Sequence, residues 1–182
     1  MSLAAWISDI RLMTTFISNS DHYAQVVERM QDVSRLLWIG TSDIKDLYVM
    51  EGQNTKPLLG VLSDLVHRGV EVRLIHAKEP GPAFREDFDK YPDLLDGMER
   101  VLCPRVHFKI VIFDLNTAYI GSANLTGAGL GMKGENTRNF EAGILTTDPE
   151  LVEKAIQQFD DVWMGSFCKE CRRKDFCPDP IV

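Results

Sequence analysis

The feature that most restricts the fold is a strand, a turn and a second strand in the middle of the chain. Residues 106–113 have the β-branched and aromatic content of a strand, and residues 110–113 are an unbroken apolar run, which is typical of a strand covered on both faces. Residues 114–117 read Asp-Leu-Asn-Thr and predict a tight turn, because Asp and Asn tolerate turn conformations. Residues 118–120 then return as the second strand.

Strand and helix patterns alternate around this hairpin. Residues 4–17 fit an extra strand or a short helix, and residues 40–54 a loop-rich connection. The other predicted elements are strands at residues 36–39, 70–75 and 139–145, and helices at residues 22–34, 57–66, 83–90 and 149–163. This alternation predicts an α/β fold in which a mixed, largely parallel β-sheet is sandwiched between helices.

Polar residues with phosphate-binding chemistry flank the hairpin. Because side chains alternate along a strand, His107 and Lys109 are expected on the same side, about 7 Å apart. A nucleophile or base therefore lies beside a fixed positive charge. After the second strand, Gly121, Ser122 and Asn124 supply a permissive backbone position, a hydroxyl and an amide, which suit contacts with phosphate oxygens.

The full pattern, His-x-Lys-x4-Asp-x6-Gly-Ser-x-Asn from His107 to Asn124, resembles the active-site signature of the phospholipase D superfamily, often called the HKD motif. This resemblance implies a phospholipase D/nuclease-like fold and phosphodiesterase activity. It also implies a covalent phosphohistidine intermediate and a catalytic step that needs no metal or other cofactor.

The resemblance also implies roles for single residues. His107 would attack phosphorus, while Lys109 and Asn124 would hold the non-bridging oxygens and Ser122 would assist the imidazole or the phosphate. Glu141 lies in the segment after the motif where the superfamily carries a glutamate that accepts a hydrogen bond from the catalytic imidazole. Asp114 belongs to the motif, but its place past the turn end of the strand favours an architectural anchor over a proton carrier.

The chain carries this motif once, and 182 residues suffice for one well-cored domain. We expect a catalytic domain at residues 1–166 and a Cys-rich tail at residues 167–182. Single-motif chains resemble the small bacterial nuclease branch of the superfamily, in which the site is completed by a second copy. The expected partner is therefore the chain itself, as a homodimer that brings two His107 residues together.

The net charge of −7 argues against a general basic coat for nucleic acid. A local patch near the motif remains open, with ordinary solvated charges as the alternative; its candidates are Arg100, Arg105, Lys109, Lys133 and Arg138. No apolar run of membrane-spanning length and no secretory signal are expected, so the cytoplasm is the default location.

Three functions fit this pattern. The first is a metal-independent nuclease, in particular an endonuclease, with nucleic acid as substrate. The second is a phospholipase D-type hydrolase or phosphatidyltransferase acting on phospholipid, for which Phe84, Phe88 and Tyr91 are the candidates for an apolar docking surface. The third is a non-catalytic module that binds phosphate or nucleic acid.

A cysteine cluster in the tail is a second signal. Cys168, Cys171 and Cys177 form a C-x2-C-x5-C pattern, and Cys103 is the only other cysteine. Four cysteines are the number that a tetrahedral zinc or an iron–sulfur cluster takes. The alternatives are a structural metal site that joins Cys103 to the tail, or free thiols or a disulfide.

Overall fold

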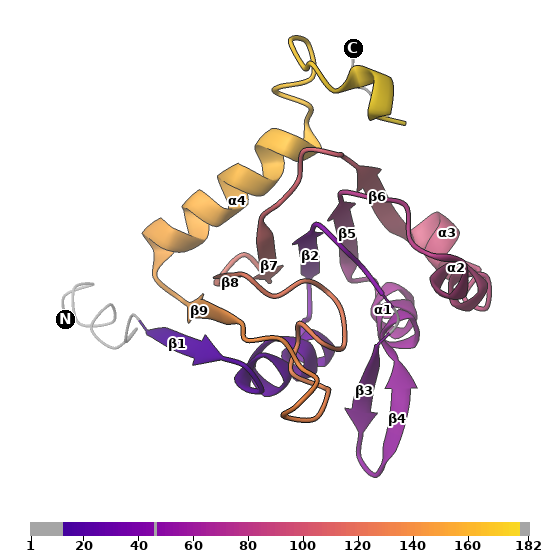
Figure 1. The fold of residues 1–182 in the computed structure, drawn as a ribbon, viewed down its shortest axis with the longest axis vertical. Helices are drawn as coiled ribbons and strands as arrows, with labels where there is room; N and C mark the ends of the chain where they lie inside the picture. Colours follow the sequence, from indigo (N-terminus) through magenta and orange to yellow (C-terminus); the bar gives the residue numbers. More distant parts are fainter. Residues whose placement is uncertain (1–12, 46, 179–182) are drawn as a thin grey trace, which may run out of the picture.

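The computed structural model describes residues 13–45 and 47–178. A seven-stranded sheet has the order β1-β9-β8-β7-β2-β5-β6, and two further strands form a separate hairpin (Figure 1). The strands of the large sheet are β1 (Thr14–Ser18), β2 (Leu36–Thr41), β5 (Glu71–His76), β6 (Met98–Leu102), β7 (Lys109–Phe113), β8 (Thr117–Gly121) and β9 (Ala142–Thr146), and the hairpin consists of β3 (Tyr48–Glu51) and β4 (Asn54–Pro57).

Helical segments connect these strands. The α-helices are α1 (Leu58–His67), α2 (Pro82–Phe88), α3 (Asp93–Gly97) and α4 (Pro149–Trp163). The shorter turns are the π-helical η2 (Tyr23–Val27) and the 3-10 segments η3 (Glu28–Asp32) and η4 (Lys174–Phe176). Among the described residues, no helix is both long enough and apolar enough to cross a bilayer.

The expected α/β class with a mixed sheet is confirmed, but of the six pairings in the large sheet two are parallel and four antiparallel, so the sheet is less parallel than expected. β2, β5 and β6 are parallel to one another and are connected through α1 and then through α2 and α3. β7 runs antiparallel to β2, and β8, β9 and β1 continue the antiparallel order. The tight turn after β7 explains why β8 is antiparallel to β7, because strands joined by so short a connection pair antiparallel.

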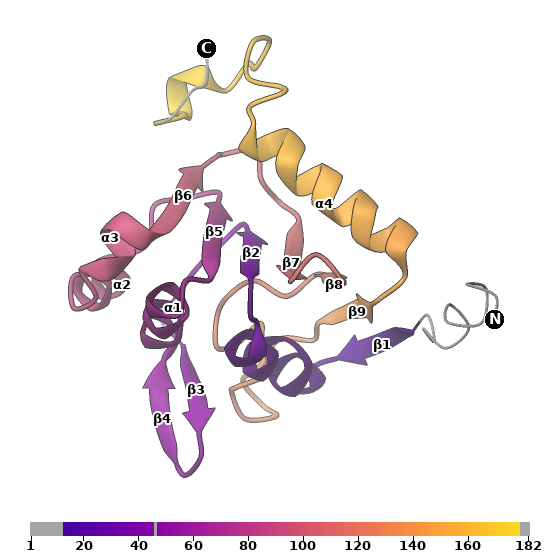
Figure 2. The same ribbon diagram turned by 180° about the vertical axis from the view of Figure 1, so that it is seen from behind.

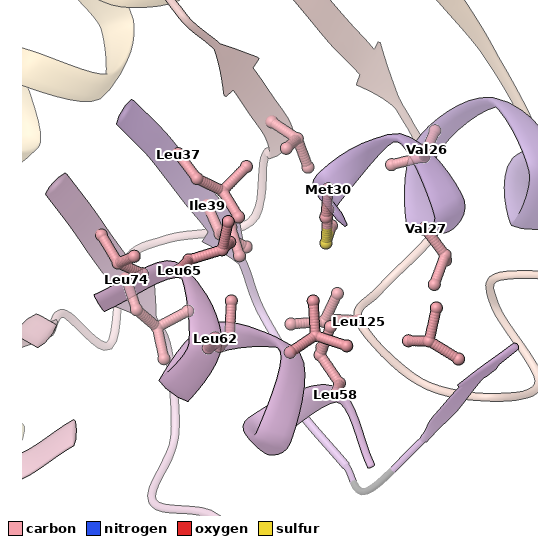
Figure 3. Packing of buried hydrophobic residues seen from close by; sticks show 14 of the residues in the cluster. Val26, Val27, Met30, Leu37, Ile39, Leu58, Leu62, Leu65, Leu74 and Leu125 are labelled. Carbon is pink, nitrogen blue, oxygen red and sulfur yellow. The ribbon is translucent and has the colours of Figure 1, made fainter. Parts of the chain in front are cut away.

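Helices cover both faces of the sheet (Figures 1 and 2). On one face, α1, η2 and η3 pack Leu62, Leu65 and Met30 against Leu37 and Ile39 of β2 (Figure 3). On the other face, α4 packs against a second cluster in which Phe159 stacks on Trp38 with ring centroids 5.2 Å apart. Because side chains alternate along β2, Leu37 and Ile39 lie on the first face and Trp38 lies on the second.

The N-terminal half differs from the sequence prediction in two places. The predicted helix at residues 22–34 winds as η2 and η3, neither of which has a side-chain cap, and it buries Val26, Val27 and Met30. Residues 40–54 contain β3 and the start of β4 rather than a loop. Of the segment at residues 4–17, the described part forms β1, and residues 4–12 lie outside the described residues.

Candidate active site

The motif residues come together at one end of the strands, where β2 and β8 finish and β7 and β9 begin. Lys109 of β7 lies opposite Gly121 of β8, which lies opposite Gly143 of β9. β2 ends beside them, with Gly40 opposite Ile110. Because neighbouring strands lie about 4.8 Å apart, the residues just beyond this row share one small region. They are His107, Ser122, Glu141 and the segment after Thr41.

His107 lies two residues before β7 and is exposed. Phe108, the next residue, packs partly buried among the side chains under α4. Its ring crosses Gly40 so closely that a Cβ at Gly40 would lie 2.2 Å from the ring. This contact holds the start of β7 against β2, and His107 before it is exposed to solvent.

Lys109 is buried, at 7% exposure, on the face opposite Phe108. Its Nζ donates a hydrogen bond of 2.7 Å to the backbone oxygen of His107. Burial lowers the pKa of Lys109, and the nearby Glu141 carboxylate partly opposes that shift. A cation held out of water in this way acts more strongly on a phosphate than a solvated lysine would.

Glu141 is the centre of a hydrogen-bond network at the start of β9. Its carboxylate accepts from the Ser122 hydroxyl and, at 3.0 Å, from Nδ2 of Asn139. The Ser122 hydroxyl also accepts from the backbone N–H of Ala142 at 3.1 Å. The expected hydrogen bond from the His107 imidazole to Glu141 is not among those formed by residues 13–45 and 47–178.

Asn124 is held by the segment that follows β2. Its Oδ1 accepts from the Ser42 hydroxyl at 2.7 Å, from the Asp43 backbone N–H at 3.2 Å and from the Thr41 hydroxyl at 3.3 Å. The Thr41 hydroxyl in turn accepts from the backbone N–H of Leu125 at 3.1 Å. Three donors fix the amide oxygen of Asn124, so its NH₂ group is the part free to serve as a donor to an anion.

Tyr119 forms the floor under this loop, and sequence reasoning did not identify it. Its hydroxyl accepts from the backbone N–H of Ala123 at 3.2 Å. Burial raises its pKa to about 12, which keeps the hydroxyl neutral. A Cβ at Gly121 would lie 2.3 Å from this hydroxyl, and one at Gly143 would lie 2.6 Å from the ring. The two glycines are the sequence signal that a large side chain passes beneath the loop.

Asp114 lies at the opposite end of β7 from His107. Its carboxylate accepts backbone N–H groups from Ser34, Arg35 and Leu36, the shortest at 2.7 Å, and also the Ser34 hydroxyl. Arg35 adds a guanidinium bond of 2.6 Å to the Asp114 backbone oxygen. Burial pushes the pKa of Asp114 upward, but these hydrogen bonds outweigh it and the pKa is lowered. Asp114 therefore anchors the hairpin to the start of β2.

The basic residues considered for the mouth of the site do not form one patch. Arg100 lies on β6, at the other edge of the sheet, over the ring of Phe88. Arg105 lines a cavity below the tail, and Arg138 pairs with Glu135 at 3.6 Å. Lys133 is exposed in the loop before β9. Of the five candidates, only Lys109 lies beside Gly121, at the end of the strands where the motif residues meet.

All four cysteines are free thiols and line a single cavity between β6, the end of α4 and the tail. The backbone N–H of Arg173 lies 3.4 Å from Sγ of Cys171, and this contact lowers the pKa of that thiol. Within the described residues, no group of three or more His, Cys, Asp or Glu side chains is already arranged to hold a metal ion.

Known proteins share this fold. The family model described as the PLD-like domain of cardiolipin synthase matches residues 37–163, whereas no curated protein sequence matches the chain. Among solved structures, NucT from Helicobacter pylori has 14% identity and a TM-score of 0.62, with 84% of this chain and 96% of that one covered.

Two further structures are similar. Nuc from Salmonella typhimurium, a phospholipase D family member, has 16% identity and a TM-score of 0.60, with 84% of this chain and 95% of that one covered. The phosphatidylserine synthase of Haemophilus influenzae has 16% identity and a TM-score of 0.54, with 81% of this chain but 39% of that one covered. These identities show a common fold, and the family match covers most of the chain. The chain therefore belongs to the family of phospholipase D-like (PLD-like) domains.

Proposed function

We propose that this protein is a metal-independent nuclease that cleaves phosphodiesters through a phosphohistidine intermediate. One observation carries the proposal: an exposed His107 lies two residues before a buried Lys109, whose ammonium group is bound to the His107 backbone oxygen. A nucleophile open to solvent, with a dry cation fixed beside it, is the combination that attack on a phosphate anion requires.

The steps follow from these residues. A ring nitrogen of His107 forms a bond to phosphorus, and the bond from phosphorus to the leaving oxygen breaks, with a proton supplied to that oxygen by an acid. Water, deprotonated by the same group, then attacks phosphorus and releases His107. Lys109 offsets the charge on the non-bridging oxygens, and the NH₂ group of Asn124 donates a hydrogen bond to them. The network of Ser122 and Glu141 borders these two residues.

The acid is the reason for proposing a homodimer. In the proposed reaction, nucleophile and acid are imidazoles in opposite protonation states, and one chain supplies one His107. A two-fold axis beside the site would bring in the partner's His107. Phe140, next to Glu141, is 92% exposed, and an aromatic side chain this open to water is suited to burial against a second copy.

Two observations favour nucleic acid over phospholipid. Phe84 is buried, and Phe88 and Tyr91 pack against the core cluster, so the expected apolar docking surface for lipid is turned inward. This chain also covers nearly the whole of NucT and Nuc but 39% of the phosphatidylserine synthase. A small unit with one motif therefore resembles the first two more than the third.

The test is cleavage of single-stranded DNA, duplex DNA, RNA and phospholipid vesicles in the presence of EDTA. We expect cleavage of a nucleic acid, unchanged by EDTA, and loss of at least about a thousandfold in His107→Ala. The matched control is His67→Ala, since His67 is also exposed but lies at the end of α1. Turnover of vesicles alone would select the phospholipase alternative. The absence of any turnover would leave the binding module as the explanation.

A further inference from the structure

The four cysteines, which the proposed reaction does not use, meet at one place. Cys103 follows β6, whereas the other three lie in the tail after α4, yet all four line a cavity of about 180 Å³. Both views of the ribbon show the tail beside the end of β6 (Figures 1 and 2). The chain contains four cysteines, so every thiol of the protein borders this one space.

The burial pattern of the tail is the reverse of a hydrophobic core. From Met164 to Pro178, the only residues that are not exposed are Gly165 and the three cysteines. Phe167 and Phe176 are 55% and 67% exposed. A segment whose aromatic side chains are largely exposed, and whose half-buried side chains are its cysteines, gains little from hydrophobic burial, so a cross-link or a bound metal would help to fix it.

The lining of the cavity also matches thiolate chemistry. Arg105, Arg173 and Lys174 border the same space, together with the single carboxylate of Asp161. Four thiolates around one divalent ion have a net charge of about −2, and this lining, with more cations than anions, offsets it. The backbone N–H of Arg173 is directed at Sγ of Cys171, as is typical of donors that stabilise a metal-bound sulfur.

We propose that Cys103, Cys168, Cys171 and Cys177 bind one thiophilic metal centre, zinc or an iron–sulfur cluster, that fixes the tail to the segment leading into His107. The thiols of the described residues do not yet surround one point, so binding includes an inward movement of the tail. The weak burial of this segment permits such a movement, as in other small metal-folded units.

The position of the site predicts what it stabilises. Val106 and Phe108 line the same cavity as the cysteines, and the backbone N–H of Val106 donates to the Cys103 oxygen at 3.0 Å. A centre at Cys103 would thus brace the turn from which His107 emerges. The role is structural, because the sulfur atoms border the opposite face from Lys109.

The first experiment measures the metal of the wild-type protein. The full chain, without an affinity tag, is produced with added zinc and iron, purified without oxygen, and analysed for zinc, iron, acid-labile sulfide and visible absorbance. We expect either about one zinc per chain with no visible band, or iron and sulfide in equal amounts with broad visible absorbance. Four free thiols without metal, or a disulfide, would overturn the proposal.

Variants test whether all four cysteines are ligands. Cys103→Ser should lower the metal content at least fivefold, although Cys103 is remote in sequence from the tail, whereas Glu170→Gln, inside the Cys-x2-Cys turn but not in the cavity lining, should keep it. Wild-type metal content in Cys103→Ser would refute the four-cysteine site.

A third measurement covers the case in which Cys103→Ser fails to fold. Removal of the metal from folded wild-type protein with a chelator should lower the melting temperature by about 5 °C or more. An unchanged melting temperature would contradict a bracing role. Nucleic-acid cleavage is not a readout here, so this proposal can fail while the proposed function stands.

Discussion

Asp114 shows how a motif residue supports the fold from the end of β7 opposite His107. Its carboxylate collects the backbone N–H groups at the start of β2 from the far end of β7. Asp114 and Leu115 have φ angles of 51° and 58°, in the left-handed region that Asp and Asn tolerate best. The same residue therefore satisfies three otherwise unpaired donors and permits the turn of the hairpin.

Replacing Asp114 should lower stability and leave the chemistry intact. Asp114→Asn keeps the turn but loses the carboxylate charge, so the free energy of unfolding should fall by about 1–3 kcal/mol at neutral pH. Urea denaturation measures this, with Asp32→Asn, at an exposed position, as the control. Cleavage per folded molecule should stay within a few fold, and its complete loss would assign Asp114 a direct catalytic role.

The same substitution has a pH signature. The pKa of Asp114 is lowered in the folded state, so its stabilising contribution is complete above the unfolded pKa of about 3.9 and is lost as pH falls through the folded value. The stability difference between wild type and Asp114→Asn should therefore shrink below about pH 4. A difference that is constant down to pH 2 would mean that the carboxylate charge is not involved.

Single residues were predictable where chemistry and spacing coincide. His107, Lys109 and Asn124 carry functional groups at intervals that few other roles explain, and the structure places them around one edge of the sheet. Hydrogen-bond partners were not predictable in this way. Glu141 binds Ser122 and Asn139, because strand register decides which polar groups meet. In the sequence, Tyr119 is indistinguishable from an ordinary buried strand residue, and only the structure shows that its hydroxyl accepts from the backbone N–H of Ala123.

At the scale of elements, the loop after β8 depends on two close approaches. Gly121 and Gly143 lie side by side over the ring of Tyr119. A side chain at Gly121 would also meet the Ala142 carbonyl oxygen at 2.8 Å, and a backbone atom cannot rotate away. β8 and β9 can therefore lie this close together at Ser122 and Glu141 only because Gly121 and Gly143 have no side chains.

Gly121→Ala should separate β8 from β9 at the site. We expect the free energy of unfolding to fall by about 1–3 kcal/mol and cleavage of nucleic acid to fall at least tenfold, because Ser122 moves with the strand. Gly134→Ala is the matched control, since a Cβ there meets nothing within 4 Å. Chemical denaturation and a cleavage assay check both variants. Equal behaviour of the two would exclude the close packing as the cause.

Elements encoded by local pattern were predicted well. The hairpin, α1 and α4 match the sequence expectation, and Asp148 caps α4 by accepting from the Glu150 backbone N–H at 2.9 Å. β3 and β4 were missed because Asn54, Thr55 and Lys56 lack apolar alternation and only Val49 of β3 is buried. The segment η2–η3 buries Val26, Val27 and Met30 but winds as a π-helix and a 3-10 helix rather than as an α-helix. Tertiary packing decides the geometry of so short a segment.

At the scale of the whole molecule, the proposed dimer has a quantitative test. Wild type and His107→Ala are mixed in equal amounts, dissociated and reassembled, and cleavage is compared with that of wild type alone. If each site needs two His107 residues, random pairing leaves about a quarter of the dimers active, whereas independent sites would retain about half. A mixture of wild type with His67→Ala is the control. A monomeric mass with full activity would contradict the shared site.

The fold class could be predicted from the sequence, but the order of the strands in the sheet could not. Alternating strands and helices sufficed for a mixed sheet with helices on both faces. The order β1-β9-β8-β7-β2-β5-β6 was not, because β1 and β9 come from opposite ends of the chain and pair through contacts that no local pattern encodes.

The hydrogen bond between Lys109 and the His107 backbone couples the positions of these two residues. The Lys109 ammonium group belongs to a residue two positions from His107, the proposed nucleophile, and also binds the His107 backbone oxygen. Any shift of the segment that leads into β7 therefore moves the ammonium group and the His107 backbone together. Movements elsewhere in the protein should change the distance between them little.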